Sequence, residues 1–183
     1  MKKEKLAILR QGAKAAKTFT PTKEFVFRPS SKVKVLEFFC EPLSYGGQLI
    51  DNFWMKFEDG RIVDVGAEKN ESLLREMVAM DEGASYLGEV ALVPYSSPIR
   101  ESGILFYNTL FDENAACHLA VGRGFSNVLR DYEKYTEEEA HEMGINDSII
   151  HVDFMIGTRD LSITAKCEDG SEAKIFENGE WAF

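Results

Sequence analysis

The sequence predicts an α+β fold made mostly of antiparallel β-sheet with a few helices. Short apolar or alternating runs dominate the chain, and only a few segments show helical spacing. The turn signals Asp59-Gly60 and Asp169-Gly170 each separate two such runs, which indicates hairpins and hence antiparallel pairing. At 183 residues the chain has the length of one domain. We therefore expect a single domain over 20–183, preceded by a basic segment, 1–19, that is either helical or disordered.

Strands are predicted from β-branched and apolar runs bounded by breakers. In the first third they cover 25–27, 33–39, 48–58 and 61–65, with a turn over 43–47. Later runs predict strands over 86–94, 148–157, 161–166 and 173–176. Residues 103–107 predict either another strand or the start of a packed turn.

Helical spacing appears over 68–81, where leucines and methionines recur between charges. Asn70 is the expected N-cap of this helix. A second, acidic helix is expected to begin after Thr136, as in a capping box, and to stop at Gly144. Residues 114–121 predict a short helix or an ordered loop.

Composition excludes several classes of function. The net charge of −10 argues against nucleic-acid binding and against an anionic membrane surface. No apolar run approaches the roughly 20 residues of a membrane span, and no signal peptide is evident. The three cysteines, Cys40, Cys117 and Cys167, are widely spaced, which suits reduced thiols. We therefore expect a cytoplasmic protein.

His151 and Asp153 lie in the apolar run 148–157, which predicts a buried strand. Side chains on a strand alternate between faces, so these two are expected to point the same way. Buried polar groups must be satisfied. A divalent metal would satisfy this pair, and so would a purely structural hydrogen bond between the imidazole and the carboxylate.

Two more residues extend this candidate site. Glu89 lies in the apolar run 86–94, where it is either buried and paired or faces outward at a strand edge. His118 is either a ligand or an ordinary loop histidine. Together with His151 and Asp153 they supply two imidazoles and two carboxylates, which suits zinc, cobalt or manganese, and two metals sharing a carboxylate would suit hydrolysis. Asp112 and Glu113 are expected to be turn and helix-start residues.

Several ordered blocks of the chain resemble one family. The blocks are 42–47 with 50–51, 86–94, 102–118, 144–148 with 151–157, and 178–183. They resemble the metal-dependent aminopeptidases of the aminopeptidase T and aminopeptidase S type, and the resemblance runs from about Pro21 to the last residue.

This resemblance implies a centre of two divalent metals (zinc, cobalt or manganese) that removes N-terminal residues from peptide substrates. The ligands that it implies are Glu89, His118, His151 and Asp153. A further ligand comes from a Pro-Thr-Glu-Glu block, which reads Pro-Thr-Lys23-Glu24 here. Either Lys23 or Glu24 takes the position of this ligand. Glu24 is the candidate ligand, and it is the candidate general base if it is not bound to a metal.

The sequence departs from the family in three ways. Lys23 replaces one acid, and Phe125 stands where the family places a tyrosine. Family members are also about twice as long, with an N-terminal α/β domain of ordinary size. The chain is therefore expected to be a C-terminal fragment or a short natural or redesigned relative, and exposed surface favours a homodimer. These departures leave a catalytically impaired metal-binding or scaffold domain as the alternative function.

Overall fold

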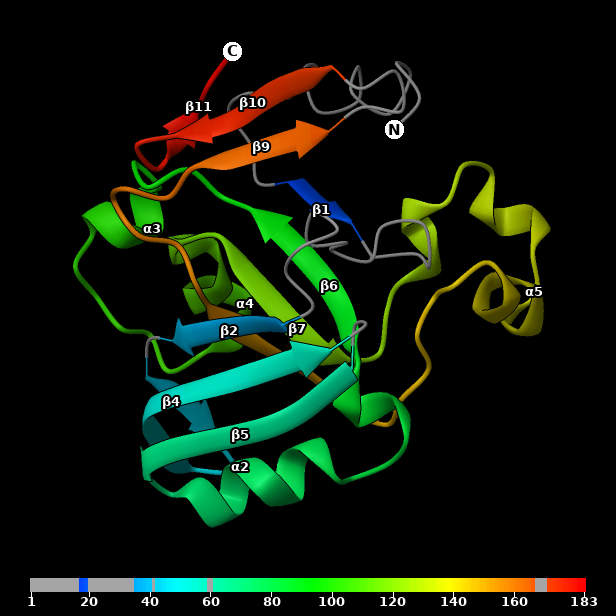
Figure 1. The fold of residues 1–183 in the computed structure, drawn as a ribbon, viewed down its shortest axis with the longest axis horizontal. Helices are drawn as coiled ribbons and strands as arrows, with labels where there is room; N and C mark the ends of the chain where they lie inside the picture. Colours follow the sequence, from blue (N-terminus) through cyan, green and yellow to red (C-terminus); the bar gives the residue numbers. More distant parts are fainter. Residues whose placement is uncertain (1–16, 20–34, 41, 59–60, 167–170) are drawn as a thin grey trace. The chain divides into compact units, whose positions relative to one another are not determined.

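The structure is a computed structural model that describes residues 17–19, 35–40, 42–58, 61–166 and 171–183 (Figure 1). The chain divides into two compact units. One contains Met1–Lys17, Ala91–His118 and Gly157–Phe183, and the other contains Thr18–Val90 and Leu119–Ile156. The predicted α+β class with mainly antiparallel sheet is confirmed. The domain boundary between residues 19 and 20 stays a prediction, because residue 20 lies outside the described part.

Strand β4 (Gln48–Glu58) is the centre of a sheet in the second unit. It pairs antiparallel with β2 (Val35–Cys40), β3 (Leu43–Tyr45) and β5 (Arg61–Lys69). The predicted 48–58 and 61–65 hairpin is confirmed, although its two turn residues lie outside the described part. The segment predicted as a turn over 43–47 also contains β3, so its turn is confined to Gly46 and Gly47.

Alternation along β4 builds part of the core of this unit. Phe53, Met55 and Phe57 point to one face and are buried. Ile50 is also buried, at an odd spacing from Phe53, because Asn52 between them has a positive φ of 46° and shifts the alternation. The ring of Phe53 meets Phe154 edge-on at 6.3 Å, which joins this sheet to the strand that carries Asp153.

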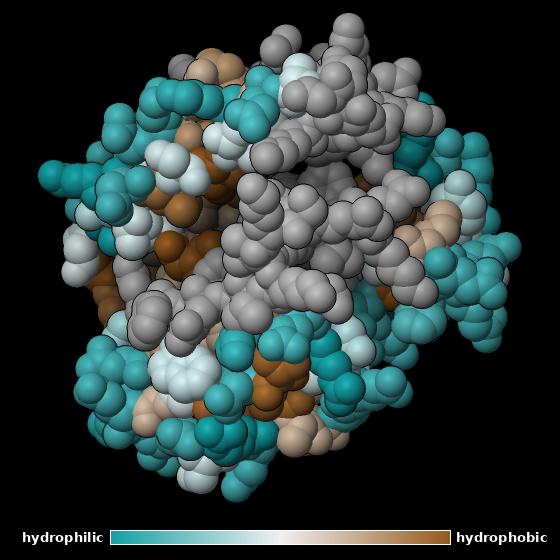
Figure 2. All heavy atoms as spheres, in the orientation of Figure 1, coloured by the Kyte–Doolittle hydropathy of each residue, from teal (hydrophilic) through white to brown (hydrophobic). Residues whose placement is uncertain are grey.

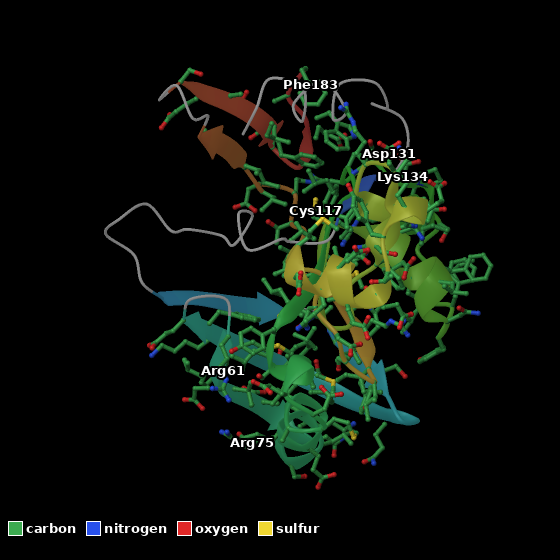
Figure 3. The ribbon with its side chains drawn as sticks, turned by 90° about the vertical axis from the view of Figure 1, so that its right-hand side faces the viewer. Arg61, Arg75, Cys117, Asp131, Lys134 and Phe183 are labelled. Carbon is green, nitrogen blue, oxygen red and sulfur yellow. The ribbon has the colours of Figure 1, made fainter. Side chains whose placement is uncertain are left out.

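Helix α2 (Glu71–Val78) buries Leu74 and Met77 and lies along β5 (Figure 1). Arg75, labelled in Figure 3, donates a 2.6 Å hydrogen bond to the carbonyl of Val65 in β5. Asn70 occupies the predicted N-cap position, but its side chain makes no capping bond. It has a φ of 60° and donates to the carbonyl of Leu49 instead.

A second sheet has the strand order β1-β6-β7-β8. Its strands are β1 (Lys17–Phe19), β6 (Leu87–Leu92), β7 (His118–Gly122) and β8 (His151–Met155). The amide of Gly122, at the end of β7, donates to the carbonyl of Tyr86 before β6, and Arg123 donates to Ile150 before β8. The end of β7 therefore lies beside the starts of both neighbours, so β7 is antiparallel to each. The prediction of a helix or loop over 114–121 is wrong for β7.

Helix α5 (Glu137–Glu142) has the predicted capping box. The hydroxyl of Thr136 accepts from the amide of Glu139, and the carboxylate of Glu139 accepts from the amide of Thr136. The helix ends before Gly144, whose φ is 98°. Its exposed acidic side chains make the surface hydrophilic at the right of the face in Figure 2.

The first unit contains an antiparallel sheet of β9 (Ile163–Lys166), β10 (Glu172–Glu177) and β11 (Glu180–Trp181). The pairing of β9 with β10 confirms the hairpin predicted across Asp169-Gly170, although these two turn residues lie outside the described part. The helices α3 (Pro98–Glu101) and α4 (Thr109–Asp112) belong to the same unit. Residues 103–107 form no strand; Ile104, Leu105 and Tyr107 are more than half exposed. Short 3-10 turns complete the chain: η1 (Gly83–Ser85), η2 (Glu113–Ala115), η3 (Ser126–Val128) and η4 (Tyr132–Lys134). Among the described helices, none is long and apolar enough to cross a membrane.

Candidate metal centre

Three adjacent strands each place one potential metal ligand in the same buried region. Glu89 comes from β6, His118 opens β7 and Asp153 comes from β8, and their exposed fractions are 5%, 2% and 3%. One ligand atom of each lies within 4.8 Å of the others. In the described part of the chain this is the only such group of three. The outward-facing position considered for Glu89 and the loop position considered for His118 are therefore both wrong.

His151 adjoins this group. Its Nε2 lies 3.3 Å from Oδ1 of Asp153 and 3.5 Å from Oε2 of Glu89. The prediction that His151 and Asp153 point to the same face of a strand is therefore confirmed. Since both carboxylates also belong to the group with His118, they are shared between two imidazoles.

The two histidines are oriented in the same way. Nδ1 of His118 lies 3.0 Å from the carbonyl oxygen of Ala116, and Nδ1 of His151 lies 2.7 Å from that of Arg123. A carbonyl oxygen only accepts, so each Nδ1 carries the hydrogen and donates. Nε2 is then the atom that each ring offers to a cation. This pattern, with the second ring nitrogen held by a backbone carbonyl, is the usual support of a metal-binding histidine.

The charges of the group favour a cation. Burial by itself lowers the pKa of His151, but the hydrogen bonds to Asp153 and to the Arg123 carbonyl, with the charges of Asp153 and Glu89, raise it to about 9. The two carboxylates thus stabilise positive charge strongly at this place. Two carboxylates and two imidazoles that present Nε2 fit a divalent metal of the zinc type.

Other predicted residues fall outside this group. The ring of Phe125 lies 4.7 Å from that of His151, so the residue that departs from the resembled family is beside the site. Lys23 and Glu24 lie outside the described residues, and their roles stay predictions. Asp112 is the last residue of α4, just before the 3-10 turn η2, and its carboxylate accepts hydrogen bonds from the amides of Phe106 and Asn108.

Cys117 precedes His118 but is not a reactive thiol. It is buried (Figure 3), and its Sγ exchanges hydrogen bonds with the backbone of Val93. Burial raises the pKa of this thiol to about 11. Cys117 is therefore protonated at neutral pH and is not a nucleophile.

Sequence reasoning missed the parts that support the ligands. The carbonyls of Ala116 and Arg123 hold the two imidazoles, yet every residue has a carbonyl, so no residue type marks them. The short apolar run His118–Gly122 was the available signal for β7.

Comparisons with known proteins identify the family of this chain. The model of the family described as thermophilic metalloprotease (M29) matches residues 16–181. Aminopeptidase AmpS of Bacillus subtilis is 56% identical over 143 residues, which are 78% of this chain and 35% of that protein. Aminopeptidase T of Thermus aquaticus is 41% identical and matches 88% of this chain and 39% of its own length.

A solved structure shares the fold. The wild-type AmpT of Thermus thermophilus superimposes with a TM-score of 0.72 at 40% identity, covering 81% of this chain and 36% of AmpT. The chain thus spans little more than a third of the length of the relatives that it matches.

Proposed function

The chain belongs to the thermophilic metalloprotease (M29) family, and from this premise we propose that it carries the metal centre of an aminopeptidase. One observation carries the proposal. Glu89 and Asp153 are buried and lie between two histidines that each present Nε2. The substrate class is peptides with a free N-terminus.

We assign the ligands as Glu89, His118, His151 and Asp153. The sharing of both carboxylates between two imidazoles supports two metals, which would be zinc, cobalt or manganese. Divalent metals in such a site polarise a peptide carbonyl and lower the pKa of a bound water. The protein's own groups have two roles at this site. The carboxylates supply negative charge that balances the charge of a bound cation, and the backbone carbonyls fix the orientation of both imidazoles.

Glu24 is the proposed further ligand. If it does not bind a metal, it is instead the proposed general base, a role that requires reach to the attacking water. Lys23 and Phe125 are the grounds for the alternative, an impaired metal-binding or scaffold domain. The same assay separates the two functions. We also propose a cytoplasmic location, for which the free thiol of Cys117 gives support.

The test is metal content followed by turnover. Purified protein is incubated with zinc, cobalt or manganese, freed of unbound metal and analysed for metal per chain. Release of the N-terminal residue from short peptides is then measured with and without a chelator. Two metals per chain and chelator-sensitive release are expected. Metal binding without release would contradict the aminopeptidase and favour the scaffold, and no binding would contradict both.

The proposed homodimer is supported by an exposed apolar segment, 102–111, in the first unit. Tyr107 and Leu110 are 74% and 76% exposed. The segment is held in shape: Tyr107 has a φ of 54°, rare for an aromatic residue, and the rings of Phe106 and Phe111 stack at 5.4 Å. It contains no charged residue of its own, although Glu101 and Asp112 flank it, so its apolar side chains can form the centre of a contact between two copies.

Leu110→Asp is expected to convert a dimer to a monomer, because it puts a carboxylate into each copy of that contact. Light scattering coupled to size exclusion gives the mass of the parent and of the variant. The matched control is Val63→Asp, at another exposed apolar side chain, 47% exposed, in the other unit. A monomeric parent, or a Leu110→Asp variant that stays dimeric, would contradict this contact.

A further inference from the structure

We propose that Phe125 and the backbone carbonyl of Arg123 form a clamp that holds the imidazole of His151 in the orientation of a metal ligand. In this role Phe125 is a positioning residue that acts through His151. The inference rests on the metal binding proposed above, but the clamp itself is a property of the metal-free chain.

Two contacts form the clamp. The carbonyl of Arg123 accepts a 2.7 Å hydrogen bond from Nδ1, which fixes one edge of the ring. The ring of Phe125 lies 4.7 Å from the imidazole at an interplanar angle of 53°, which restricts its tilt. Both contacts come from the few residues that follow β7. A flip of the imidazole would remove the hydrogen from the carbonyl and turn Nε2 away from Asp153 and Glu89.

His151 needs such a clamp more than His118 does. The side chain of His151 is 22% exposed, whereas the whole of His118 is 2% exposed and is fixed by the surrounding core. The carboxylates that His151 meets are nearly immobile by comparison, since the side chains of Glu89 and Asp153 are 7% and 2% exposed. A ligand at the start of a strand that is partly exposed to water needs contacts in addition to core packing to hold it.

The clamp requires an aromatic ring at position 125, and a hydrophobic side chain without a ring cannot replace it. Phe125 is 42% exposed, so filling the core is a minor part of what it does. A side chain of similar hydrophobicity without a ring would keep the packing and lose the face that restrains the imidazole. This distinction makes the clamp testable.

The experiment compares the parent with Phe125→Leu, which removes the ring, and Phe125→Tyr, which keeps it. Tyr135→Leu is the matched control, because Tyr135 is also 42% exposed in the same unit. The first readout is the proton and ¹⁵N chemical shifts of the His151 ring in metal-free protein. The second is the dissociation constant for Zn²⁺ or Co²⁺, measured by competition with a chelating dye. Cooperative thermal unfolding verifies that each variant is folded.

Phe125→Leu is expected to lose the ring-current shift of His151 and to bind metal about tenfold more weakly, the lower end of the effect of removing a group that supports a ligand. Tyr135→Leu should keep both properties, and Phe125→Tyr should keep the ring-current shift and bind metal no more weakly than the parent. Unchanged His151 shifts in Phe125→Leu would overturn the clamp. A parent that binds no metal would overturn the proposed function, and the metal-free shifts would still decide the clamp. A parent and a leucine variant of equal affinity would overturn only the clamp's role in metal binding.

Discussion

Asp153→Asn is expected to remove metal binding and, with it, any aminopeptidase activity. The substitution keeps the size of the side chain and removes its charge, at a residue that is 3% exposed and lies within reach of both imidazoles. Loss of a ligand should exceed the 10–100-fold cost of losing a group that supports a ligand, so we expect affinity to fall more than about a hundredfold. His118→Ala should also remove metal binding, because it removes an imidazole ligand of the same group.

Thermal unfolding provides a readout that does not depend on activity. A metal at about 100 times its dissociation constant stabilises the folded state by roughly 2.7 kcal/mol, so Zn²⁺ should raise the melting temperature of the parent. The same concentration should leave Asp153→Asn unchanged. Asp131→Asn is the control, since this acid pairs with Lys134 at the surface (Figure 3) and is not a member of the group. If zinc stabilises Asp153→Asn as much as the parent, Asp153 is not a ligand.

Periodicity allowed the sequence to predict much of the site. The run 148–157 is apolar on both sides of His151 and Asp153, so a strand follows from the pattern, and a shared face follows from the strand. The structure bears this out, because Nε2 of His151 is 3.3 Å from Oδ1 of Asp153. The contact of His151 and Asp153 with Glu89, by contrast, joins residues that are far apart in the sequence. It depends on which strands pair, and local pattern does not encode pairing.

The position of His118 was harder to predict for a local reason. Its strand β7 has five residues, all buried, and short apolar runs do not distinguish a strand from a buried helix. The acidic and polar residues before it, including Asp112, favour a turn or helix start, and the structure does place a 3-10 turn there. The predicted helix or loop over 114–121 therefore holds only up to the 3-10 turn, which ends at Ala115, and β7 begins at His118.

Glycines near the strand ends also determine the geometry of the site, and Gly122 has the least room for a side chain among those of the ligand-bearing strands. Its φ is 93°, and a Cβ on it would lie 2.1 Å from the carbonyl oxygen of Ile150. Gly88, next to Glu89, is similarly crowded, since its Cβ would lie 2.2 Å from the carbonyl oxygen of Gly122. The strands that carry Glu89 and Asp153 can approach β7 this closely only because these two residues have no side chain.

Gly122→Ala is therefore expected to destabilise the protein by about 3 kcal/mol or more, as left-handed strain of about 1–2 kcal/mol adds to overpacking of about 1–3 kcal/mol. Urea unfolding measures the loss. Gly46→Ala isolates the strain, because Gly46 has a φ of 55° but nothing within 4 Å of its Cβ position. Equal losses in the two variants would show that β7 and β8 are not in close contact at Gly122. A larger loss in Gly122→Ala, with weaker metal binding, would show that the ligand geometry depends on backbone contacts that no ligand residue reveals.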